Sequence, residues 1–191
     1  MKKNIIIFGL GVVTLSLTAF GFMKNNSFKE VQNCSVVTKI EDPKDVNYFT
    51  TFKDKDYTLH FEIDNSESKP SLIISILLHN DSYFVSPHAK RDFKGKFYMD
   101  LGNYSNLDFD SEIIETPQSV EEIDSHPYVN GTVNWVRKNT IYKQPLNIKT
   151  QEDFTVFGRV QFTIEPRCTL EVMPFGISYE NGKMRLIDPK C

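Results

Sequence analysis

Apolar and polar positions alternate along much of the chain, in the period of two that is typical of half-buried β-strands. In the clearest case, Phe154–Ile164, every second residue is apolar or glycine. Asp56–Asp64 alternates in the same way, and the β-branched run Leu72–Leu78 has the composition of a central strand. We expect the inward-facing side chains of these and later strands to be Leu59, Phe61, Ile74, Ile76, Trp135, Val156, Val160 and Phe162.

Turn residues between these segments indicate hairpins. Asn181-Gly182 separates two short apolar segments, Phe175–Tyr179 and Met184–Ile187, and favours a tight turn in which both central residues have positive φ. Arg137–Asn139 separates Val133–Val136 from Thr140–Tyr142 and predicts a second hairpin.

Another strand is expected at Phe97–Leu101, after the turn Lys94–Lys96, and a weaker strand pattern occurs at Leu107–Ile114. Beyond the N-terminal region, a helical period is suggested at most by a short turn near Ser119–Ile123. Seven to nine short strands at this spacing predict an all-β, immunoglobulin-like antiparallel β-sandwich.

The N-terminal segment has the layout of an export signal. Lys2 and Lys3 precede the apolar run Ile5–Phe22, which contains the small-residue pattern Ala19-Phe20-Gly21. We therefore expect residues 1–21 to be a signal peptide, with an uncleaved membrane anchor as the alternative. A polar segment follows at 22–47, and one sandwich domain at 48–191. This organisation predicts a periplasmic or secreted protein, which contacts a membrane only if the N-terminal segment remains uncleaved.

Composition narrows the classes of function. The formal net charge is −3, and the sequence has no extended cluster of Lys or Arg, which argues against nucleic-acid binding. His60, His79, His88 and His126 are far apart, and no Gly-rich phosphate loop occurs outside the N-terminal segment. The sequence therefore predicts neither a metal site nor a cofactor. Trp135 is expected to pack in the core, with stacking on a ligand as the alternative.

The three cysteines, Cys34, Cys168 and Cys191, are widely spaced, and an odd number leaves at least one without an internal partner. The sequence around Cys168 resembles a known family. A strand Phe154–Ile164 leads to Cys168, and a segment containing Pro174 leads to a final strand at Phe175–Ile177.

This arrangement resembles the closing strands of the N-terminal periplasmic domain of DsbD-type thiol–disulfide interchange proteins. His79–Pro87 and Trp135–Leu146 are similar to other parts of that domain, and the resemblance spans about residues 55–180.

The resemblance implies a catalytic role for Cys168, which aligns with the second cysteine of the family's reactive pair. No sulfur stands at Thr163, Ile164 or Glu165, where the first cysteine would lie. A lone thiol can form a mixed disulfide, but it cannot resolve it without a second sulfur. A disulfide between Cys168 and Cys191 would supply one, and Cys191 is a better candidate than Cys34.

Two functions follow. The first is a non-catalytic exported module that binds a periplasmic or membrane-bound protein. The second is thiol–disulfide exchange with a partner protein through Cys168. We expect Cys168 at the end of the strand that begins at Phe154, with Arg167 on the opposite face. Glu165 and Glu171 should then oppose ionisation of the thiol, which favours the first function.

Overall fold

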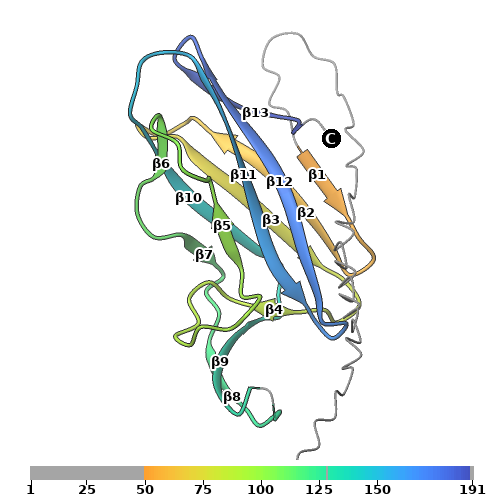
Figure 1. The fold of residues 1–191 in the computed structure, drawn as a ribbon. Helices are drawn as coiled ribbons and strands as arrows, with labels where there is room; N and C mark the ends of the chain where they lie inside the picture. Colours follow the sequence, from red (N-terminus) through yellow and green to blue (C-terminus); the bar gives the residue numbers. More distant parts are fainter. Residues whose placement is uncertain (1–49, 128, 190–191) are drawn as a thin grey trace, which may run out of the picture. The chain divides into compact units, whose positions relative to one another are not determined.

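The computed structural model describes residues 50–127 and 129–189, and in these residues it is all-β. Two antiparallel sheets face each other across the main core, and a third, smaller sheet lies at one end (Figure 1). The predicted antiparallel β-sandwich is confirmed. The described strands outnumber the seven to nine expected, because several comprise only two to four residues.

The first sheet has the order β1-β2-β3-β10-β6, and β7 also pairs with β10. Its strands are β1 (Thr50–Lys53), β2 (Tyr57–Asp64), β3 (Ser71–Leu78), β6 (Leu107–Phe109), β7 (Ile114–Thr116) and β10 (Thr140–Ile148). The alternation predicted for residues 56–64 is present in β2, where every second residue is buried.

The second sheet has the order β13-β12-β11-β5. Its strands are β5 (Tyr98–Asp100), β11 (Phe154–Ile164), β12 (Thr169–Glu180) and β13 (Lys183–Ile187). The two long strands, β11 and β12, form a hairpin that is paired over the whole length of β11. The turn of this hairpin, residues 165–168, lies near the small sheet at the end of the sandwich (Figure 1).

The third sheet, called the small sheet below, has the order β4-β9-β8. It consists of β4 (Phe84–Val85), β8 (Glu121–Asp124) and β9 (Gly131–Val136). Figure 1 shows β8 and β9 beyond the ends of the long strands. The segment near 119–123, expected to be a helical turn, is therefore mostly strand.

The core between the two large sheets is rich in aromatic residues. Seven of the eight predicted inward-facing residues are at most 1% exposed, from Leu59 and Phe61 on β2 to Phe162 on β11. The prediction for Trp135 is wrong, because β9 belongs to the small sheet. Trp135 is only half-buried and packs against a second cluster formed by Val85, Ala89, Val129 and Val133.

One predicted hairpin is confirmed and the other is wrong. β12 and β13 form the tight hairpin, with φ of 51° at Asn181 and 78° at Gly182. β9 and β10 do not pair with each other: β9 pairs with β4 and β8, whereas β10 pairs with β3, β6 and β7. The intervening residues carry the chain from the small sheet to the first sheet, where the Asn139 side chain accepts a hydrogen bond from the Leu78 N–H at 2.9 Å.

The expected signal peptide, the polar segment and two of the cysteines, Cys34 and Cys191, lie outside the described residues. In the part of the chain that is described, no helix is long and apolar enough to cross a membrane.

Candidate functional site

Cys168 lies in the turn between β11 and β12, with φ of 52°, rather than at the end of a strand as the sequence suggested. Its side chain is exposed, and its thiol forms no disulfide with any residue of 50–127 or 129–189. The Sγ–H donates a hydrogen bond to Glu165 Oε2 at 3.1 Å. This bond and the negative charge of Glu165 raise the pKa of Cys168. Since the thiolate is the nucleophile, the raised pKa makes Cys168 less reactive at neutral pH than an ordinary exposed cysteine.

The pairing of Cys168 with Cys191 stays a prediction, because Cys191 lies outside the described residues. The same holds for the catalytic role, which depends on a second sulfur.

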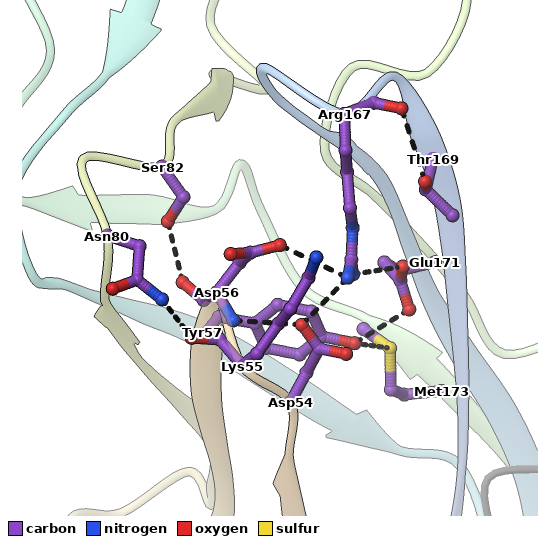
Figure 2. A network of polar contacts seen from close by, with 10 residues as sticks. All are labelled: Asp54, Lys55, Asp56, Tyr57, Asn80, Ser82, Arg167, Thr169, Glu171 and Met173. Carbon is purple, nitrogen blue, oxygen red and sulfur yellow. Dashed lines mark hydrogen bonds and ion pairs between the residues drawn. The ribbon is translucent and has the colours of Figure 1, made fainter.

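Arg167, next to Cys168, is the centre of an ionic network that joins the β11–β12 turn to the turn between β1 and β2 (Figure 2). Its Nη1 lies 3.0 Å from Asp54 Oδ1 and 3.1 Å from Asp56 Oδ2. Its Nη2 lies 2.6 Å from Glu171 Oε1 on β12. Burial lowers the pKa of Arg167, but the three carboxylates raise it by more than burial lowers it. The pKa therefore lies above its ordinary value, and the guanidinium remains charged.

The Glu171 carboxylate also accepts a hydrogen bond, at 2.9 Å, from the hydroxyl of Tyr57, which packs in the main core (Figure 2). Burial, reinforced by the charge of Glu171, raises the pKa of Tyr57 well above its ordinary value. Glu171 was expected to oppose ionisation of Cys168. Its carboxylate instead bonds Arg167 and Tyr57, and the charge that raises the pKa of the Cys168 thiol is that of Glu165. The network therefore holds the β11–β12 turn against the turn between β1 and β2.

Tyr83 connects the cysteine turn to the small sheet. Its backbone exchanges two hydrogen bonds with Glu165, of 3.2 and 2.8 Å. Its ring meets the Trp135 ring edge to face, with centroids 4.9 Å apart. The Arg137 guanidinium lies 4.2 Å from the Tyr83 centroid and 5.7 Å from the Trp135 centroid. Tyr83, Trp135 and Arg137, called the aromatic–Arg cluster below, thus lie beside the turn that carries Cys168.

Carboxylates of β8 hold the aromatic–Arg cluster in place. Trp135 Nε1–H donates to Asp124 Oδ2 at 3.0 Å, and Arg137 donates to Glu122 Oε1 at 3.1 and 3.2 Å. A hydrogen bond from the His126 N–H, followed by that from Trp135, lowers the pKa of Asp124, which keeps it ionised at neutral pH. The cluster is therefore pre-organised, although its arginine is half exposed.

A buried carboxylate joins the small sheet to the first sheet. Glu115, on β7, accepts hydrogen bonds from Ser86 Oγ at 2.7 Å, from the Tyr142 hydroxyl at 2.8 Å and from the Ser119 N–H at 2.6 Å. Ser86 directly follows β4, and Ser119 lies just before β8. The Glu115 carboxylate is therefore bonded next to each of the two outer strands of the small sheet. Burial, and then the charge of Glu115, raise the pKa of Tyr142 well above its ordinary value.

The histidines lie apart. His60 bonds Thr51 and His79 bonds Thr58 on the first sheet. In residues 50–127 and 129–189, no group of three or more His, Cys, Asp or Glu side chains is arranged to hold a metal ion. Within the described residues, the grouped features are therefore the Cys168 turn and the neighbouring small sheet.

No protein-family model matches the chain, and no curated protein matches it. Among solved structures, the reduced N-terminal domain of DsbD from Neisseria meningitidis is similar over 67% of this chain and 89% of that chain, with 10% identity and a TM-score of 0.35. The GAE domain of GGA2p from Saccharomyces cerevisiae is similar over 70% of this chain and 98% of that chain, with 11% identity and a TM-score of 0.34. Neither similarity assigns a family, so the resemblance drawn from the sequence stays a prediction.

Proposed function

We propose that this chain is an exported, non-catalytic module that binds a protein partner through its small sheet. The observation that carries the proposal is the aromatic–Arg cluster. Trp, Tyr and Arg are the residue types that most often dominate the energy of protein–protein binding. Here Tyr83, Trp135 and Arg137 are held together at the surface by their mutual contacts and by β8 carboxylates.

Exposed apolar side chains on the same part of the molecule support this function. Ile123 on β8 is 84% exposed and Val120, just before β8, is 79% exposed, more than any other large hydrophobic residue in the described part of the chain. A single exposed apolar residue needs no explanation, but two of them on or next to a strand whose carboxylates hold a Trp–Tyr–Arg group indicate a contact surface.

Site-directed photo-crosslinking in the source cells tests the proposal. A photoreactive benzoyl-phenylalanine replaces the exposed Lys138, next to Arg137, or the exposed Thr155 on β11 as a reference position. We expect a discrete cross-linked product from position 138 and none from position 155. Equal products at the two positions, or none at 138, would refute the proposed surface.

Arginine variants make the test specific. Arg137→Ala should remove most of the cross-linked product. Arg159→Ala is the matched control: Arg159 is also half exposed and also pairs with a carboxylate, Asp100, but it lies on β11. The control should leave the product unchanged. If both variants have the same effect, the aromatic–Arg cluster does not bind the partner.

Thiol–disulfide exchange through Cys168 is the second candidate, and the exposure of its side chain favours it. The raised pKa of Cys168 opposes it. Alkylation with a mass tag, with and without reductant, counts the free thiols of the purified chain. We expect Cys168 to react no faster than a free thiol at the same pH, and Cys168→Ser to preserve folding and export. A Cys168-dependent exchange rate well above that of a free thiol would establish the redox function instead.

A further inference from the structure

β8 is an edge strand of the small sheet. Among the described residues it pairs with β9 alone, along Glu121–Asp124. The backbone groups on the other side of such a strand are available to pair with an added strand. Its side chains are unusual for a strand, because three of its four residues are acidic and the fourth is the highly exposed Ile123.

The acidic side chains of β8 are ordered. Glu121 pairs with Lys90 at 3.0 Å, Glu122 with Arg137 at 3.1 Å, and Asp124 bonds Trp135. A hydrogen bond from Lys90 lowers the pKa of Glu121, so this carboxylate is ionised at neutral pH. Three carboxylates thus stand against two cations, Lys90 and Arg137, so this edge carries a net negative charge. Because side chains alternate along a strand, Glu122 and Asp124 lie on one face of β8, and Glu121 and the apolar Ile123 lie on the other.

The charges decide between two occupants of this edge. In an antiparallel pair of two β8 strands from two copies of the chain, acidic residues would lie opposite or next to acidic residues. Like charges across a strand pair are destabilising, whereas opposite charges stabilise it. The excess of carboxylates over cations at this edge thus disfavours a second copy and suits an extended segment that carries Lys or Arg.

We propose that β8 receives an extended segment of the partner protein as an added strand, in which basic residues alternate with apolar ones. The main chains pair along the open edge, the basic side chains lie on the face of Glu122 and Asp124, and an apolar side chain covers Ile123 on the other face. This inference rests on the proposed function, since it specifies the partner of the same small sheet. The bound strand lies next to the aromatic–Arg cluster, because Asp124 and Glu122 contact its Trp and Arg.

Synthetic peptides test the added strand on the purified full chain. The probe is acetyl-Lys-Val-Lys-Val-Lys-Val-amide, and its counterpart has Glu in place of each Lys. Trp135 is the only tryptophan of the chain and bonds Asp124, so its fluorescence reports binding. We expect saturable binding of the basic peptide alone, together with about fivefold or greater slowing of hydrogen exchange at the amides of residues 121–124.

A substitution at the exposed side chain locates the binding. Ile123→Lys should weaken the basic peptide by about tenfold or more, because it adds a like charge and removes the apolar contact. The matched control is Leu170→Lys, a 54% exposed leucine on β12 of the second sheet, which should change the affinity little. Circular dichroism checks that both variants are folded.

Other outcomes overturn the inference. Equal binding of the acidic and basic peptides, or protection outside β8, rules out the added basic strand. Protection of β8 that rises with protein concentration in the absence of peptide identifies a second copy as the occupant. If the peptide fails to bind but the cross-linked product at position 138 persists and still requires Arg137, the added strand is wrong and the interaction module stands. If both are absent, both are wrong.

Discussion

Replacing Arg167 by methionine removes the cation that three carboxylates share, while it keeps most of the aliphatic length of the side chain. Exposed ion pairs contribute about 0–1 kcal/mol, and breaking a buried pair by removing one partner costs about 3–5 kcal/mol. The side chains here lie between these limits but closer to burial: 23% of Arg167, 12% of Asp56 and 10% of Glu171 are exposed. We therefore expect Arg167→Met to lower the free energy of unfolding by roughly 2–3 kcal/mol.

Urea denaturation at pH 7, followed by the fluorescence of the single tryptophan and by far-UV circular dichroism, measures this loss. The matched control is Arg185→Met, because Arg185 pairs with Glu180 at 2.7 Å where both side chains are nearly half exposed. This control should show little change in stability. The slope of the free energy against urea concentration should stay constant in both variants.

A double variant separates the charge from the loss of packing. In Arg167→Met combined with Glu171→Gln, one of the uncompensated carboxylates is gone. The double variant should therefore lose less stability than the sum of the two single variants. If Arg167→Met is as well tolerated as Arg185→Met, or if the two losses simply add, the guanidinium does not compensate these carboxylates and the reasoning is refuted.

Substitutions at three further positions test other features. Gly158→Ala should lower the free energy of unfolding by about 1–3 kcal/mol, because the added Cβ would lie 2.7 Å from the carbonyl oxygen of Asp100. An unchanged midpoint of urea denaturation would show that β11 and β5 can move apart to make room for the methyl group. Gly182→Val should cost about 1 kcal/mol or more through backbone strain at φ 78°, since nothing lies within 4 Å of its added Cβ, and Gly182→Asn should be milder. Glu165→Gln should lower the pKa of Cys168 and so accelerate its alkylation by iodoacetamide at pH 8, with a shift of the rate–pH profile toward lower pH. An unchanged profile would contradict the Glu165 contact.

The strands that are long and regular could be predicted because their signal is local. The alternation in β11 places Val156, Val160 and Phe162 on one face whichever face is buried, and burial of that face follows from its apolar character. The Asn181-Gly182 turn is likewise set by the two residues that can take positive φ. In both cases the information lies within a dozen consecutive residues.

The misses come from pairings between distant residues. Arg137–Asn139 looks like a hairpin turn, but which strands lie beside β9 and β10 depends on the whole sheet order. The Arg167 network was not predicted because its aspartates, Asp54 and Asp56, lie more than a hundred residues earlier in the chain. For the aromatic–Arg cluster, the sequence contains one local signal, because Trp135 and Arg137 are two positions apart. Its third member, Tyr83, lies about fifty residues earlier in the chain, so the sequence alone does not place it beside them.

The small sheet has four buried apolar residues of its own, with Trp135 and Phe93 packed against them only in part. Phe84 and Val136 tie β4 and one end of β9 to the main core. Because the rest of the small sheet has so few buried contacts, we expect it to open at a lower free energy than the sandwich. The carboxylate of Glu115 bonds groups next to both outer strands of this sheet. An amide there would place its NH2 either against the Ser119 N–H, which can only donate, or against the hydroxyls of Ser86 and Tyr142, which both donate to the carboxylate. Glu115→Gln should therefore speed hydrogen exchange in β8 and β9 while β2 and β3 exchange as before. Equal acceleration throughout would show a single unit. A substitution at Glu115 can therefore change how long the contact surface stays folded, without altering any residue that a partner touches.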